Sequence, residues 1–117
     1  MNFKDNNPIY LQIAERICDE ILQGIYREDD RIPSVREYAA MVEVNANTVV
    51  RTYDWLQSQE IIYTRRGLGY FVSPEAGEKI FTLRKATFFA TDLPEFFKQL
   101  RALEIPISDI VRMYEEK

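Results

Sequence analysis

The fold is decided by residues 32–72, which read IPSVREYAAMVEVNANTVVRTYDWLQSQEIIYTRRGLGYFV. Ser34 is followed three residues later by Glu37, which is the pattern of a capping box: the hydroxyl and the carboxylate satisfy amide groups that the first helical turn leaves unpaired. A helix is therefore predicted to begin at Ser34. Its apolar residues recur at steps of three and four and end near Glu43, so one stripe of this helix should face a core.

A second helix is predicted to begin at Asn45, a favourable N-cap residue that also tolerates the sharp turn between the two helices. With about 100° between successive residues, the side expected to face the core carries Ala46, Val49, Val50, Tyr53 and Leu56. The outward side carries Asn47, Thr48, Arg51, Asp54 and Trp55. Asparagine can pair with adenine, arginine with guanine, and threonine with a base or a phosphate, so this face suits DNA. For such a helix standing alone, an ordinary solvated face would be the alternative.

A β-hairpin is predicted to follow the helix pair. Residues 61–64 and 70–72 are rich in β-branched and aromatic side chains, and the loop RRGLG between them has two glycines suited to positive φ. Its paired arginines, Arg65 and Arg66, can contact a phosphate backbone or enter a minor groove; keeping an edge strand soluble is their alternative role. Two helices and a hairpin in this order are the layout of a winged helix-turn-helix, which is typical of DNA-binding proteins.

Three motifs together resemble the N-terminal domain of the GntR family of bacterial transcription regulators. They are IPSVRE at residues 32–37, NANTVVRTY at 45–53 and TRRGLG at 64–69. Because only a short tail follows, the chain is most similar to the YtrA subfamily. The resemblance covers residues 8–72 strongly and the tail weakly. It implies DNA contacts from the arginine two positions after the serine of the Pro-Ser motif, from the start of the recognition helix and from the wing-tip glycine.

The chain departs from the better-studied branches of the family at two positions. Those branches carry arginines where this sequence has Ala46 and Val50, so their base-reading pattern does not transfer. On geometry, Arg51 is the candidate substitute. The residues predicted to contact DNA are Ser34, Arg36, Asn45, Asn47, Thr48, Arg51, Arg65, Arg66 and Gly67.

The net charge of −4 has the opposite sign to that of most DNA-binding domains. Residues 1–72 alone hold 8 basic and 11 acidic side chains. The distribution of these charges, however, favours DNA: five acidic residues lie between positions 19 and 30, whereas four of the arginines lie on the elements predicted to face DNA. We therefore expect a small basic patch, modest non-specific affinity and a strong dependence on salt.

Composition also excludes several classes of protein. A single cysteine and no histidine exclude an intrachain disulfide, a zinc site and a histidine-based catalytic triad within one chain. The sequence contains no paired acid and base, no activated nucleophile and no phosphate-binding loop that would indicate an enzyme. No metal or other cofactor is expected. No apolar run approaches a membrane span, and residues 1–5 lack the apolar stretch of a signal peptide. We therefore expect a cytoplasmic protein with no membrane partner.

The remaining chain is predicted to be mainly helical. The first helix should open at Asn7-Pro8 and end at Gly24, with Cys18 a core residue rather than a reactive thiol. A short strand between this helix and Ser34 could join the hairpin. The expected organisation is a winged helix-turn-helix domain over residues 1–72, a linker over 73–77 and a short helical dimerisation tail over 78–117.

The tail is predicted to form three short helices, one of them started by a second capping box from Asp92 to Glu95. Its five phenylalanines exceed what so short a segment can bury alone. A second copy of the chain would cover them and present two recognition helices to a palindromic site, and the YtrA-type tail is regarded as a dimerisation module. Packing on the chain's own first helix is the alternative. The predicted interface residues are Phe81, Phe88, Phe89, Phe96, Phe97, Leu100 and Ile110.

We predict a sequence-specific DNA-binding regulator: a homodimeric repressor of an inverted-repeat operator. The alternative is a winged-helix module that binds another protein, which the negative charge favours. The resemblance implies control of transporter genes, commonly those of ABC transporters. The tail is too short for a large enclosed pocket, which leaves the dimer interface as the place open to an unknown small-molecule effector.

Overall fold

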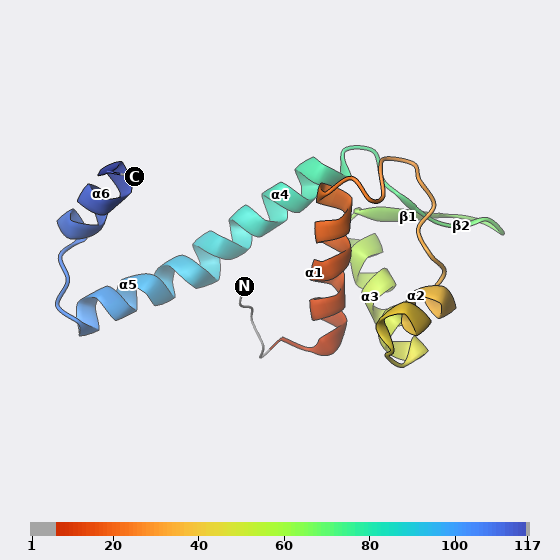
Figure 1. Cartoon of the computed structure of the whole chain (residues 1–117), viewed down its shortest axis with the longest axis horizontal. Helices are drawn as coiled ribbons and strands as arrows, with labels where there is room; N and C mark the ends of the chain where they lie inside the picture. The colour runs from red at the N-terminus through yellow and green to blue at the C-terminus, as the bar shows by residue number, and fades with distance from the viewer. Residues whose placement is uncertain (1–6, 117) are drawn as a thin grey trace. The chain divides into compact units, whose positions relative to one another are not determined.

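The protein is represented by a computed structural model that describes residues 7–116 (Figure 1). The first six residues of the predicted N-terminal domain lie outside this range, and so does residue 117. The elements in chain order are α1 (Ile9–Leu22), α2 (Val35–Val42), α3 (Ala46–Ser58), β1 (Ile62–Arg65), β2 (Gly69–Val72), α4 (Ala76–Thr87), the π-helical turn η1 (Phe88–Asp92), α5 (Leu93–Ala102) and α6 (Ile107–Glu116). The predicted fold, mainly helical with a small hairpin, is confirmed.

Both predicted helix starts of the central segment are confirmed. The amide of Glu37 donates to Ser34 Oγ at 3.1 Å, and Glu37 Oε1 accepts from the amide of Ser34 at 2.9 Å. These bonds from Ser34 favour the carboxylate form and lower the pKa of Glu37. At the next helix, Asn45 Oδ1 accepts from the amide of Asn47 at 2.7 Å. Between the two helices, Glu43 adopts φ 58° and so makes the sharp turn.

The core of the first unit gathers around two tyrosines with fully buried side chains. The Tyr53 ring meets that of Tyr70 edge-on, with centroids 4.8 Å apart, and its hydroxyl donates to the carbonyl of Pro33 at 2.6 Å. The Tyr38 hydroxyl donates to Glu20 Oε1 at 3.1 Å. Burial raises the pKa of both tyrosines, so each hydroxyl stays protonated and keeps its role as a donor. Hydrogen bonds thus join α2 to α1 and α3 to the segment before α2, and a ring contact joins α3 to the hairpin.

The predicted inward face of α3 is partly wrong. Val49, Tyr53 and Leu56 are fully buried, but Val50 is 41% exposed and Ala46 is also exposed. The buried side includes Thr52 instead, whose Oγ1 lies 2.8 Å from the carbonyl oxygen of Tyr10. The buried stripe is centred between Val49 and Leu56, so Val50 falls on its flank.

The hairpin lies where the sequence predicted it, and the segment around Arg31 pairs with it as a third segment. β1 and β2 pair antiparallel, with Tyr63 opposite Phe71 and Arg65 opposite Gly69. Arg31 bridges to Phe71, and the amide of Ile32 donates to the carbonyl of Tyr70 at 2.9 Å. The prediction that the segment before Ser34 adds to the hairpin is therefore confirmed.

The chain divides into two compact units between Phe81 and Thr82, inside α4. Ala76 and Ile80 are buried and belong to the first unit. The amide of Glu75 donates to Glu28 Oε2 at 2.9 Å, which fixes the start of α4 to the loop after α1. The segment expected to be a linker is thus partly helical.

The predicted capping box from Asp92 to Glu95 is wrong. Asp92 has helical dihedral angles (φ −70°, ψ −42°) and makes no side-chain capping bond among the described residues. η1 leads directly into α5, so no helix begins at this point. A cap is needed only where the preceding residues leave amides unpaired, and here the π-helical turn continues the backbone bonding. Within residues 7–116, no helix is long and apolar enough to cross a bilayer.

We expect Tyr53→Phe to lower the free energy of unfolding by about 1 kcal/mol, because the carbonyl of Pro33 loses a partly buried donor. The measurement is urea unfolding followed by circular dichroism, with an unchanged m-value. Tyr63→Phe is the matched control: its hydroxyl donates to Asp29 at the surface, and its removal should leave the midpoint unchanged. Equal shifts in both variants would contradict the structural role given to Tyr53.

Candidate nucleic-acid interface

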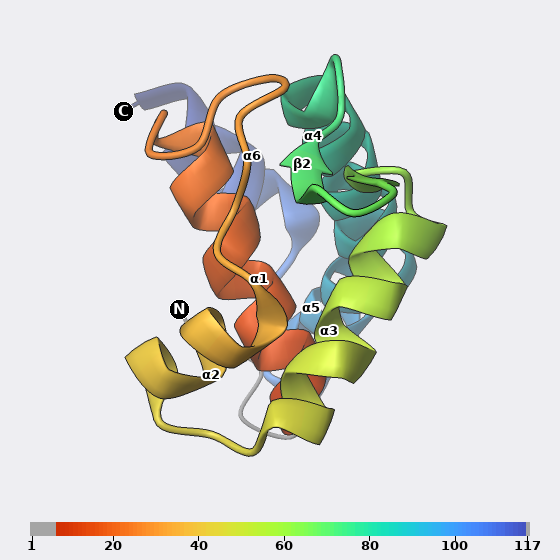
Figure 2. The ribbon, with the colours of Figure 1, turned by 90° about the vertical axis from the view of Figure 1, so that its right-hand side faces the viewer.

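The residues predicted to contact DNA come from α2, the start of α3 and the hairpin tip. In Figure 1 the hairpin tip and α2 lie toward the same side of the first unit, and Figure 2 looks onto that side. Arg36, Arg65, Arg66 and Gly67 are all exposed. The structure therefore brings the segments that carry the predicted residues to one side of one unit, although Ser34 and Gly67 are 33 positions apart in sequence.

The helix pair presents polar groups that its own caps leave available. The Ser34 oxygen accepts the amide of Glu37, which leaves the hydroxyl proton as a donor. Asn45 uses its carbonyl oxygen as a cap, which leaves its NH₂ group. Asn47 is exposed and Thr48 is half-buried. Donors of this kind at the N-terminus of a helix can contact phosphate oxygens or base edges.

Arg51 has a specific partner that sequence reasoning missed. Its guanidinium carbon lies 4.1 Å from the centroid of the Tyr10 ring, which is within the range of a cation–π contact. Thr52 binds the carbonyl of the same tyrosine, so the first turn of α1 lies along this flank of α3. Stacking uses the face of the guanidinium and leaves its N–H edge for other partners. No local pattern in the sequence pairs residues 10 and 51, since the contact depends on how α1 and α3 pack.

The wing holds its arginines in different ways. Arg65 lies over Phe71, with 4.9 Å between its guanidinium carbon and the ring centroid. Arg66 and Gly67 form the exposed tip, where Gly67 adopts φ 76° and the amide of Leu68 donates to the carbonyl of Arg65 at 2.8 Å. A side chain in place of the glycine would be strained at this φ.

Arg31 is a further basic residue of the wing that sequence reasoning did not include. It is exposed and pairs with β2, and its Nε lies 3.0 Å from where a Cβ on Gly69 would stand. The signal available in the sequence was the short strand expected before Ser34, which carries Arg31 to the hairpin. The wing therefore carries Arg31, Arg65 and Arg66.

The acidic loop after α1 is bonded at the base of the hairpin and at the start of α4. Asp29 Oδ1 accepts from the Tyr63 hydroxyl at 2.8 Å, and Asp30 Oδ2 accepts from the amide of Arg27. These carboxylates thus have partners within the first unit. The donors are a neutral hydroxyl and a neutral amide, so these bonds fix the position of the carboxylates and leave their negative charge in place.

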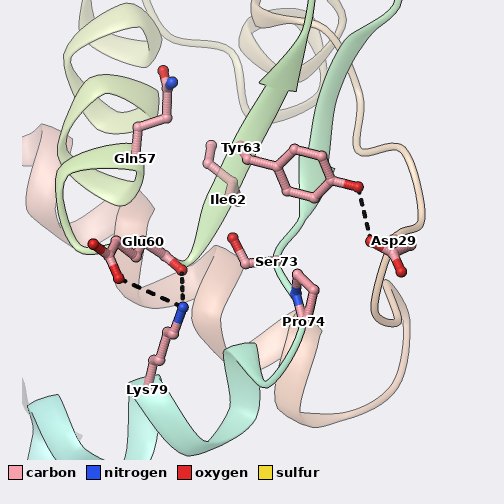
Figure 3. Close-up of a pocket in the computed structure, with 8 residues that line it drawn as sticks. All are labelled: Asp29, Gln57, Glu60, Ile62, Tyr63, Ser73, Pro74 and Lys79. Carbon is pink, nitrogen blue, oxygen red and sulfur yellow. Dashed lines mark hydrogen bonds and ion pairs between the residues drawn. The ribbon is translucent and has the colours of Figure 1, made fainter.

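The base of the hairpin also borders an open hollow of about 510 Å³. Figure 3 shows Lys79 of α4 donating to the carbonyl of Glu60 at 3.3 Å on one side, and Tyr63 bound to Asp29 on the other. The lining is a mixture of apolar and polar groups, and Lys79 with Glu60 and Tyr63 with Asp29 form two interacting pairs in it. Residues 7–116 bring together no cluster of side chains that could hold a metal ion.

The sequence matches the family model of gntR bacterial regulatory proteins over residues 9–72. It is 38% identical to YhcF of Bacillus subtilis, an uncharacterized HTH-type transcriptional regulator, over 86% of this chain and 82% of that protein. It is 40% identical to the HTH-type transcriptional repressor YtrA of the same organism, over 62% of this chain and 56% of that protein. The matched region thus spans little more than half of YtrA.

Solved structures agree with this assignment. A GntR-family protein from Bacteroides thetaiotaomicron is 55% identical, with a TM-score of 0.82 over 93% of this chain and 95% of that chain. The DNA-binding domain of AraR, solved in complex with operator ORX1, is 30% identical, with a TM-score of 0.56 over 62% of this chain and 89% of that chain. The chain therefore belongs to the gntR family of bacterial regulatory proteins, in which it is a YtrA-like DNA-binding transcription regulator.

Proposed function

We propose that this chain is a homodimeric, cytoplasmic repressor that binds an inverted-repeat operator. The observation that carries the proposal is that α2, the start of α3 and the hairpin tip lie toward one side of the first unit (Figure 2), and that Arg36 of α2 and Arg66 of the tip are exposed. In this arrangement α3 enters the major groove with its first two turns, and the wing arginines contact the flanking phosphates. AraR supports it as a relative whose DNA-binding domain was solved on an operator.

Within this proposal the exposed side chains of α2, α3 and the wing have different chemical roles. Arg36 and Arg66 neutralise phosphates, and Arg31 and Arg65 add charge along the wing. Asn47 and Thr48 reach the base edges and the adjoining backbone. Arg51, held against the Tyr10 ring, presents its N–H edge in a fixed direction, so less side-chain entropy is lost on binding.

The dimer is proposed from the apolar surface of the second unit together with Phe81. Phe88 and Phe89 are 47% and 55% exposed, and they come from η1, with ring centroids 5.8 Å apart. Phe81 and Phe96 are exposed as well, and Phe97 and Ile110 are half-buried. Leu100 is only 7% exposed within the single chain, so it is the one predicted interface residue with little surface to offer a partner.

α6 adds a stripe that the predicted interface did not include. Ile107, Val111 and Tyr114 are spaced one helical turn apart and are 54%, 46% and 82% exposed. A helix with one apolar and one charged side normally buries its apolar side. A second copy of the chain would cover these residues in a symmetric contact and would set the spacing of two recognition helices.

Arg36→Ala and Arg66→Ala should each weaken binding to a random-sequence duplex and reduce the salt slope by about one unit, because each removes one phosphate contact. The measurement is fluorescence anisotropy across a salt series. Arg101→Ala, an exposed arginine in the last turn of α5, is the control and should change neither quantity. Wild-type affinity and slope in both test variants would rule out the assigned interface.

The wild-type chain should sediment as a dimer, and Phe88→Asp combined with Val111→Asp should sediment as a monomer, because two desolvated carboxylates would oppose an apolar contact. Ile25→Asp is the matched control: Ile25 is 57% exposed in the first unit, and its variant should stay dimeric. A monomeric wild-type protein at micromolar concentration would contradict the proposed assembly.

A further inference from the structure

The exposed side of α3 contains two apolar side chains in the turns that would enter a groove. Ala46 and Val50 are four residues apart and so lie one above the other, and both are exposed. Val50 is 41% exposed, although the adjacent Val49 is fully buried. These two residues were expected to face the core, and their exposure instead leaves apolar surface available to a partner.

The opposite flank of the same helix is already occupied. Arg51 stacks on the Tyr10 ring at 4.1 Å, and Thr52 binds the carbonyl of Tyr10, so α1 lies on that side. Val50 lies about 100° around the helix from Val49, on the flank away from this contact. The first two turns therefore present an apolar strip, formed by Ala46 and Val50, next to the polar side chain of Asn47.

The next turn limits how far this surface extends. Asp54 is exposed one turn beyond Val50 and carries a negative charge. Deeper contact along the helix would bring its carboxylate close to DNA phosphates, which is unfavourable. The contact region on α3 is thereby confined to residues 46–51, in which Ala46 and Val50 are the exposed apolar side chains.

Base edges offer few partners for apolar side chains. In the major groove, guanine, cytosine and adenine present hydrogen-bonding groups, and only thymine adds a methyl group, at C5. An alanine or valine placed against a donor or acceptor would exclude water and leave that group unpaired, at a cost to binding. Against a thymine methyl group, the same side chain buries apolar surface on both sides.

We propose that Ala46 and Val50 are specificity-determining residues that select thymine in each half-site through contact with its C5 methyl group. The inference rests on the proposed function, since it requires that α3 enters the major groove. It names the chemical feature that this surface recognises: a methyl group next to the hydrogen-bonding edge that Asn47 contacts. The apolar strip discriminates between bases without forming a hydrogen bond.

The test replaces thymine by uracil, which keeps the base pair and removes only the methyl group. The probe is the duplex most enriched by the wild-type protein from a random pool, resynthesised with one uracil at a time. We expect about a fourfold rise in Kd for each uracil that removes a methyl group in contact with Val50, which is the loss anticipated for one buried methyl group. Positions outside the strip should be insensitive.

A mutant cycle assigns the effect to the residue. Val50→Ala should weaken binding to the thymine duplex and show no further loss with uracil at the sensitive position. Ile25→Ala, at another exposed aliphatic residue, should keep the full uracil penalty. Thermal unfolding checks that both variants fold, and the uracil series on the wild-type protein needs no variant at all.

Three results would overturn the inference in different ways. Equal affinity of the wild-type protein for the thymine duplex and every uracil duplex would exclude methyl recognition and leave the proposed function intact. Failure to enrich any duplex from the pool would overturn the proposed function and the inference together. A uracil penalty that persists unchanged in Val50→Ala would exclude Val50 as the contacting residue.

Discussion

Tyr53 is the residue on which the arrangement of the DNA-binding unit depends. It belongs to α3, its hydroxyl binds the carbonyl of Pro33 just before α2, and its ring meets Tyr70 on β2. One buried side chain therefore relates the proposed recognition helix both to its partner helix and to the wing. Positioning of this kind is what a winged helix needs, because base contacts and phosphate contacts must be made at the same time.

Local signals in the sequence predicted the central segment well. Ser34 and Asn45 act within four residues of themselves, so their capping bonds could be anticipated without knowing the rest of the fold. The same pattern failed at Asp92, since a serine- or aspartate-based cap forms only if the chain before it is not already helical. The turn η1 carries the backbone through this point, and nothing in residues 92–95 alone reports that.

Tertiary contacts decided the features that the sequence did not predict. Residue type placed Val50 in the core, but the packing of α1 on α3 turns Thr52 inward and leaves Val50 exposed. Arg51 was recognised as outward-facing, but its stacking on Tyr10 joins residues forty-one positions apart. The position of Arg31 beside the wing likewise depends on strand pairing across the sheet. The positions of these three residues change which side chains the candidate interface offers to DNA. They do not change which elements form the interface.

The proposed function depends on symmetry: two copies of one recognition helix bind one DNA site. Selection of bound duplexes from a random pool at physiological salt tests this most directly. We predict that the enriched sequences contain an inverted repeat whose half-sites are separated by about one helical turn or a multiple of it. Enrichment of a single asymmetric site, or no enrichment above weak binding that vanishes as salt rises, would contradict the account.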